Sequence, residues 1–239
     1  MMEIALFTTC LGDLFAQEAV LSTARVLRRL GHTITVPPQT CCGQPAMNSG
    51  FPGEAEPFVA AYRRGFQDAQ AVVAPSGSCV AMLRHGLREF FPGDERAAAL
   101  AGRTYELTQF LLDVQGLDRP QGRFSGRAIY HESCHLAHWL HEAGRADQLL
   151  GGIEGLQLLH FPEPQLCCGF GGTFAVHFPE LSLAMADEKV SQLPSEPPDF
   201  LVASDQGCLL QLGGRLAAQG QKTQPLHVAV LLDRAGVGA

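Results

Sequence analysis

The sequence predicts an α/β protein made of two pseudo-symmetric, Rossmann-like halves, each with a mainly parallel sheet and flanking helices. Short apolar runs alternate with amphipathic stretches along the chain, as strands and helices do when they follow one another. The second observation is a cysteine pattern that occurs twice and uses all eight cysteines: Cys10, Cys41, Cys42 and Cys79, then Cys134, Cys167, Cys168 and Cys208. The two copies divide the chain into residues 1–118 and 119–239.

The repeat extends beyond the cysteines. VVAPSGSC at 72–79 aligns with LVASDQGC at 201–208 without a gap, and PQTCCG at 38–43 aligns with PQLCCG at 164–169. Matching segments of this length indicate that the two halves share one fold.

Apolar runs and helical periodicity define the expected elements of the first half. The expected strands are 4–7, 32–36 and 71–74, and the expected helices are 16–30 and 54–69. Gly31 ends the first helix, because glycine is common just after a helix. The glycine-rich stretch 113–126 is the expected boundary between the halves.

The same reasoning defines the second half. The expected strands are 127–131, 156–160 and 200–203, and the expected helices are 134–150, 179–192 and 208–219. Each cysteine group then follows a strand, and the carboxyl ends of parallel strands are where open α/β sheets gather their sites. We therefore expect one compact four-cysteine site in each half.

Bulk composition limits the class of protein. Of the 239 residues, 46% are hydrophobic and 17% are charged, and the net charge of −7 argues against nucleic acid as a main partner. No apolar run is long enough to span a bilayer, and the N-terminus lacks the basic region of a signal peptide. The cytoplasm is the expected location, where patterned cysteines more often bind metal or act in catalysis than form disulfides.

Four thiolates that converge on one spot can hold a metal ion or an iron–sulfur cluster. Adjacent cysteines such as Cys41 and Cys42 suit two different irons of one cluster, and Gly43 and Gly169 after each pair leave room for the backbone near an inorganic core. Structural zinc is an alternative because it accepts four thiolates. Inert buried cysteines and a catalytic dithiol are weaker alternatives, since the pattern is duplicated and contains no CxxC.

A second group of candidate residues is a run of histidines around Cys134. His135, His138 and His141 have a spacing that could line one face of a helix and bind zinc, with His131 nearby. The favoured interpretation is polar groups beside a cluster loop, in which His135 donates a hydrogen bond to a cluster sulfur. No flavin, nicotinamide or phosphate-binding fingerprint is visible, so hydride removal would need another protein.

Several motifs together resemble the lactate-utilisation protein A family of cysteine-rich CCG-domain proteins. The family is related to the cysteine-rich subunit of heterodisulfide reductase and to the iron–sulfur subunit of glycolate oxidase. The motifs are TCLGDLF (9–15), QTCCGQPAMNSG (39–50), VVAPSGSCVAM (72–82), RTYELTQFL (103–111), HESCHLAH (131–138), CCGFGGTFAVHFPELSLAMADEKV (167–190) and SDQGCLLQLGGRL (204–216).

The resemblance implies an iron–sulfur oxidoreductase subunit that acts with two other proteins in oxidising L-lactate to pyruvate. It implies electron transfer through a 4Fe–4S cluster in each half, held by the four cysteines of that half. A zinc-stabilised interaction module without redox activity and a subunit of a heterodisulfide-type reductase are the alternatives.

The sequence departs from the fullest form of this pattern at two positions. Relatives of the heterodisulfide-reductase type end each copy in CxxC, with five cysteines per half, whereas here Ser76 and Asp205 stand in place of the extra cysteine. Either residue could be an oxygen ligand to the metal centre. Both residue types also favour the N-cap of a helix, which is the preferred interpretation.

Overall fold

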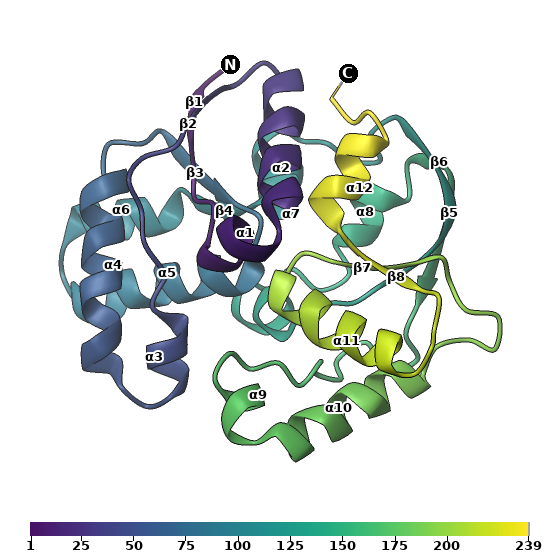
Figure 1. The fold of residues 1–239 in the computed structure, drawn as a ribbon. Helices are drawn as coiled ribbons and strands as arrows, with labels where there is room; N and C mark the ends of the chain where they lie inside the picture. Colours follow the sequence, from purple (N-terminus) through teal and green to yellow (C-terminus); the bar gives the residue numbers. More distant parts are fainter. Residues whose placement is uncertain (239) are drawn as a thin grey trace.

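Two four-stranded parallel sheets form the framework of the computed structural model, which describes residues 1–238 (Figure 1). The first sheet has the order β2-β1-β3-β4, with β1 (Glu3–Leu6), β2 (Thr33–Thr35), β3 (Ala71–Ala74) and β4 (Thr104–Glu106). The second has the order β6-β5-β7-β8, with β5 (Gly122–Tyr130), β6 (Ile153–His160), β7 (Phe200–Ala203) and β8 (Gln224–His227). The identical strand order confirms the predicted α/β fold with two similar halves.

Helices follow most strands. In the first half these are α1 (Cys10–Phe15), α2 (Gln17–Arg29), α3 (Gln44–Asn48), α4 (Pro52–Phe66), α5 (Gly77–Phe90), α6 (Glu95–Gly102) and α7 (Leu107–Gln109), which runs into the π-helical turn η1 (Phe110–Val114). In the second half they are the π-helical turn η2 (His135–Trp139), α8 (Ala146–Leu150), α9 (Phe174–His177), α10 (Pro179–Ser191), α11 (Gln206–Ala218) and α12 (Val228–Arg234).

All six predicted strands form, although β5 begins at Gly122, inside the stretch 113–126 that the sequence predicts as the boundary between the halves. β3 and β7 have the predicted bounds, because each is an apolar run between turn residues. The edge strands β4 and β8 were not predicted. Both are short and lack a clear alternation of polar and apolar residues, and Pro225 in β8 is tolerated because that strand pairs on one side only.

The predicted helix over 134–150 is wrong. Only the turn η2 and the short α8 form there, and the chain between them is irregular. His141 has a φ of 59° and Gly144 a φ of 73°, both in the left-handed region, which ends a right-handed helix. The backbone N–H of Gly144 instead donates to the carboxylate of Glu132. The histidines of this segment therefore do not share one helix face.

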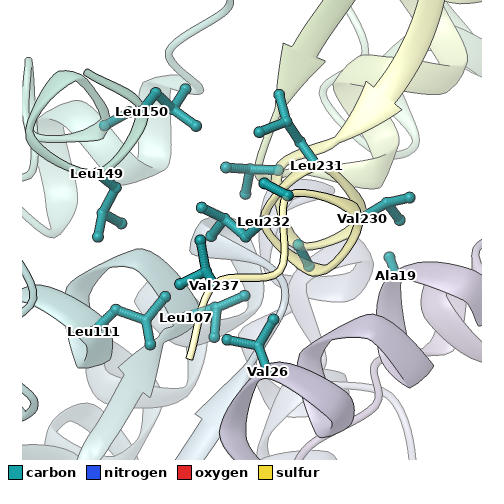
Figure 2. Packing of buried hydrophobic residues seen from close by; sticks show 14 of the residues in the cluster. Ala19, Val26, Leu107, Leu111, Leu149, Leu150, Val230, Leu231, Leu232 and Val237 are labelled. Carbon is teal, nitrogen blue, oxygen red and sulfur yellow. The ribbon is translucent and has the colours of Figure 1, made fainter. Parts of the chain in front are cut away.

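A hydrophobic cluster with buried residues from both halves joins them, as Figure 2 shows. Val26 of α2, Leu107 of α7 and Leu149 of α8 meet Leu232 of α12 and Val237, which follows α12. In Figure 1, α12 near the C-terminus lies beside α2 of the first half. The C-terminal helix therefore packs on the N-terminal half as well as on its own sheet. The division at residue 118 stays a prediction.

Between residues 1 and 238, no helix combines the length and the apolar character that crossing a membrane requires.

Candidate metal centre

All eight cysteines line one cavity of about 270 Å³ between the two halves. They reach it from six loops, each at the carboxyl end of a strand or at the start of the helix that follows. β1 and β3 are neighbours at the point where the strand order of the first sheet reverses, and β5 and β7 are their counterparts. Such a point is where ligands bind in open α/β sheets. The sequence predicted two sites, but not that they face each other across one cavity.

The first set surrounds the start of three helices. Cys10 opens α1, Cys41 and Cys42 precede α3, and Cys79 lies in the first turn of α5. The sulfur atoms of Cys10 and Cys41 are 3.8 Å apart, and the backbone N–H of Gly43 donates to the Cys41 sulfur at 3.4 Å.

The second set repeats this arrangement. Cys134 precedes η2, Cys167 and Cys168 lie in the loop before α9, and Cys208 lies in the first turn of α11. The sulfur atoms of Cys168 and Cys208 are 3.0 Å apart. The N–H of Gly169 donates to the Cys167 sulfur at 3.4 Å, the same distance as in the first half.

Hydrogen bonds between the thiols lower the pKa of Cys41 in the first set and of Cys167 and Cys208 in the second. A hydrogen bond from Cys10 is the main reason that the pKa of Cys41 lies well below the ordinary value for a thiol. A hydrogen bond from Cys134 has the same effect on the pKa of Cys167. The pKa values of the two donors are raised for the same reason. A lowered pKa favours the thiolate, which is the form of cysteine that binds metal.

The donor set fits a thiolate-bound metal centre. Each half presents four sulfurs, at least one of them with a lowered pKa, and a backbone N–H that points at sulfur. Hydrogen bonds to sulfur are among the features that set the potential of iron–sulfur clusters. Four sulfurs in each half would also accept a zinc ion.

Comparisons with known proteins agree with this geometry. A family model described as a cysteine-rich domain (CCG) matches the chain twice, at residues 4–84 and 128–213. Lactate utilization protein A of Geobacillus sp. (strain WCH70) is 44% identical to this chain over 237 residues, which is 97% of this chain and 99% of that protein. The chain belongs to this family. Lactate utilization protein A 2 of Bacillus cereus (strain Q1) is 40% identical, with 98% of each chain covered.

A solved structure shares the fold. A hypothetical protein from Helicobacter pylori superposes with a TM-score of 0.63 at 14% sequence identity. The superposition covers 98% of this chain and 49% of that protein, so the chain spans about half of that protein's length. At this identity the likeness shows the architecture alone.

The glycine of each CCG motif has a backbone conformation that other residues rarely adopt. Gly43 has a φ of +89° and Gly169 a φ of +82°. A Cβ on Gly169 would lie 2.4 Å from the carbonyl oxygen of Ser182 in α10, and one on Gly43 would lie 3.0 Å from that of Ala55 in α4. The nearest atoms thus belong to α4 in the first half and α10 in the second, which is a different reason for glycine from room for an inorganic core.

Ser76 and Asp205 occupy equivalent positions but act differently. The Ser76 hydroxyl accepts a hydrogen bond from the backbone N–H of Cys79 at 3.2 Å, which confirms the predicted N-cap of α5. Asp205 stands at the N-cap position of α11 but makes no capping hydrogen bond, so that part of the prediction is wrong.

The Asp205 carboxylate reaches instead into the first half. Its Oδ1 accepts from the hydroxyls of Ser76 and Ser78, each at 2.7 Å, and from the Ser78 N–H at 3.1 Å. Its Oδ2 is buried and has no hydrogen-bond partner within residues 1–238. Both Ser76 and Asp205 line the cavity, so an oxygen ligand stays a prediction.

Further polar contacts join the halves around the cavity. His135 Nε2 lies 3.0 Å from Nε2 of Gln44, and its Nδ1 lies 3.8 Å from the Cys134 sulfur. The Ser49 and Thr173 hydroxyls are 2.7 Å apart. His135 therefore stands beside a cysteine, as the sequence predicts, and burial lowers its pKa, which favours the neutral ring.

The sequence did not predict a role for His131, which was noted only as lying near the other histidines. The structure places its ring among the buried cysteines of the second set: one ring nitrogen and the sulfurs of Cys168 and Cys208 all lie within 4.8 Å of one another. A comparison of the residues that follow the first strand of each half, Phe7 and His131, would have drawn attention to it.

Proposed function

We propose that this protein is an iron–sulfur electron-transfer subunit of a multi-protein system that oxidises L-lactate to pyruvate. It would act in the cytoplasm with two other proteins. Relatives that match nearly the whole chain carry the name lactate utilization protein A. The observation that carries the electron-transfer role is the cavity in which the two four-cysteine sets face each other.

In this proposal each cysteine set holds one cluster, of the 4Fe–4S type. When bound, such a cluster takes up and releases one electron at a time. Cys42, Cys79, Cys168 and Cys208 are buried and would hold the inner side of each cluster away from water. Cys10, Cys41, Cys134 and Cys167 are half-buried and would hold the outer side.

The surface near the first set supports a protein partner. Helix α1 begins at Cys10 and ends with two large apolar side chains, Leu14 and Phe15, whose exposed fractions are 71% and 64%. Val176, which follows the second CCG motif, lines the cavity and is also exposed. Exposed apolar groups of this size are typical of protein–protein contact sites. Electrons would therefore enter or leave where a partner covers these groups.

Purification under strict exclusion of air, followed by iron, sulfide and zinc analysis, tests the proposal. We expect iron and acid-labile sulfide, with an EPR signal after reduction that identifies the cluster type. Addition of lactate and the partner proteins should then reduce the clusters. A protein that contains zinc and no iron under these conditions would contradict electron transfer and support a zinc-stabilised interaction module.

The two halves offer a matched pair of variants. Cys42 and Cys168 are equivalent, are buried to the same extent, and each lies beside two other thiols of its set. We expect Cys168→Ala to remove the iron of the second half only and Cys42→Ala that of the first, so that each variant keeps about half of the iron. Loss of all iron in either variant would instead indicate one shared centre.

The same preparation tests the heterodisulfide-type alternative. Thiol release from a disulfide substrate, with no reduction by lactate and the partner proteins, would replace the lactate proposal with a disulfide reductase. We expect the reverse result.

A further inference from the structure

We infer that His131 supplies a nitrogen ligand to the metal centre of the second cysteine set, which makes the two centres chemically different. This inference rests on the proposed function, because it requires that the second set holds a metal centre. It concerns a residue whose counterpart in the first half is Phe7.

The backbone shows that His131 and Phe7 are equivalent. The N–H of Phe7 donates to the carbonyl of Val73 in β3 at 2.9 Å, and the N–H of His131 donates to that of Val202 in β7 at 2.7 Å. Each residue therefore continues the same strand pairing by one step and points its side chain to the same side of its sheet. The internal symmetry of the protein is broken at this position by an imidazole.

The two side chains have different surroundings. The Phe7 ring packs edge-on against the rings of Tyr62 and Phe66, with centroids 5.5 and 5.8 Å away, as an ordinary core residue does. The His131 ring is just as inaccessible, with an exposed fraction of 1%. Within the part of the chain that the structure describes, however, neither of its nitrogens has a hydrogen-bond partner.

A buried imidazole without partners is costly. Burying a polar group without a hydrogen bond is unfavourable, so buried side-chain nitrogens almost always have a partner. A metal ion satisfies a neutral imidazole nitrogen directly, since that nitrogen carries a free lone pair. His131 thus fits a ligand that the protein chain itself does not supply.

The position of the ring identifies that ligand. A ring nitrogen of His131 and the sulfurs of Cys168 and Cys208 lie within 4.8 Å of one another, and all three residues are buried. This is the spacing of atoms that share one metal centre, and imidazole and thiolate are both common ligands of iron and zinc.

The other candidates for an extra ligand are held by contacts with the first half. Oδ1 of Asp205 accepts three hydrogen bonds from Ser76 and Ser78, which leaves its Oδ2 alone without a partner among residues 1–238, and Nε2 of His135 lies against Gln44. His131 therefore raises the donor set of the second half from four to five, whereas the first half keeps four. The fifth donor is a nitrogen instead of the fifth cysteine of the related pattern.

Nitrogen ligation has an electronic consequence. Imidazole is neutral where a thiolate is negative, and the type of ligand is one of the features that set the reduction potential of an iron–sulfur centre. A centre held by four thiolates and an imidazole should therefore differ in reduction potential from a centre held by four thiolates alone.

Pulsed EPR of the anaerobically purified, reduced holoprotein tests the inference, with protein that carries ¹⁵N-labelled histidine for comparison. We expect a strong coupling to a histidine nitrogen that changes on labelling. The coupling should disappear in His131→Phe, which copies the first half, and in His131→Asn, which keeps a small polar side chain. Iron and sulfide are measured on the same samples.

His32 provides a matched control. It is also buried, and neither of its nitrogens has a hydrogen-bond partner among residues 1–238, but it precedes β2 at the opposite end of the sheet from the cysteines. His32→Phe should leave the nitrogen coupling and the iron content unchanged, which separates ligation from a general effect of losing a buried histidine.

The outcomes distinguish this inference from the proposed function. Wild-type protein with iron but no histidine coupling overturns the inference and leaves the proposed function standing. A coupling that persists in both His131 variants overturns it as well, and would assign the nitrogen to another histidine. Wild-type protein without iron overturns both.

Discussion

Asp205, which lines the cavity, lies near two other buried acidic groups. Glu106, at the end of β4, and Tyr130, at the end of β5, are both buried. Burial is the main cause of the raised pKa of each, and the charge of Asp205 adds to it. Oε1 of Glu106 and the hydroxyl of Tyr130 have no hydrogen-bond partner within residues 1–238. Acidic groups from both halves therefore lie close together in a medium of low polarity.

Glu106 gives a prediction on pH. Burial raises its pKa to about 8, from an ordinary value near 4.5, so the folded protein keeps a proton that the unfolded chain has released. The free energy of unfolding should therefore fall as the pH rises from about 4.5 to about 8, by up to about 1.4 kcal/mol per pH unit. Glu106→Gln, whose amide oxygen can still accept from Thr108, should remove this slope in denaturant titrations across that range. If the free energies of unfolding of both proteins changed with pH in the same way, the prediction would be wrong.

At the scale of elements, the second CCG loop is held against α10 by hydrogen bonds from two side chains of that helix. The hydroxyl of Ser182 in α10 donates to the carbonyl of Gly169 at 2.8 Å, and Lys189 of the same helix donates to the carbonyl of Glu163 at 2.8 Å. The Lys189 ammonium also lies 4.1 Å above the ring of Phe161. α10 thus fixes the loop at both ends, and the position of Cys167 and Cys168 depends on this packing.

Gly169→Ala should disturb this packing. The left-handed φ alone costs about 1–2 kcal/mol for a residue with a Cβ, and the contact with the Ser182 carbonyl should add about 1–3 kcal/mol. Gly50→Ala is the control, because Gly50 has a φ of +83° with nothing within 4 Å of the added Cβ. Denaturant unfolding should show the larger loss for Gly169→Ala. If both variants lost the same free energy of unfolding, the backbone angle alone would explain why glycine is required.

At the scale of the molecule, the two halves are joined by α2 and α12. Beside the hydrophobic cluster, the Asp233 carboxylate accepts from Arg25 Nε at 2.6 Å, from Arg29 at 2.7 Å and from the Ser22 hydroxyl at 3.0 Å. The Asp233 side chain is 10% exposed, so these bonds are partly shielded from water. Burial alone would raise its pKa, but the hydrogen bonds outweigh burial and lower it.

This contact predicts the effect of Asp233→Asn. Loss of the charge should lower the free energy of unfolding by about 1–3 kcal/mol at pH 7. The contribution is present above the unfolded pKa near 3.8 and is lost as the pH falls through the lower folded value, so the difference from wild type should shrink in acid. Glu18→Gln is the control, because Glu18 also pairs with Arg25 but is 56% exposed and should contribute less than about 1 kcal/mol. If Asp233→Asn and Glu18→Gln lowered the free energy of unfolding by similar amounts, the partly buried position of Asp233 would not explain its contribution.

Most of the fold could be predicted from the sequence because most strands and helices of each half have a recognisable local pattern of apolar residues. The apolar run of β3 and the amphipathic pattern of α2 are such signals. The prediction of a helix over 134–150 was wrong although the sequence has helical periodicity there. His141 and Gly144 take left-handed conformations, which interrupt the helix. The edge strands β4 and β8 were missed because they are short and pair on one side only.

The candidate site was predictable only within each half. The duplicated pattern identified the cysteine loops, and strand order brought them to the correct edge of each sheet. The meeting of the two sets in one cavity depends on how the halves pack, through contacts such as that of Asp205 with Ser76, which has no local signal in the chain. The position of His131 among the cysteines is a consequence of the same tertiary packing.

The hydrophobic cluster of Figure 2 has a consequence for the order of events during synthesis. Ile4 and Val26 are synthesised well before Leu232 and Val237, with which they share a core. During synthesis α2 therefore stays partly uncovered until α12 has been made, and the cysteines of the first set are present before those of the second set complete the cavity. We expect the four cysteines of the first half to stay accessible to thiol reagents until the second half has folded against them.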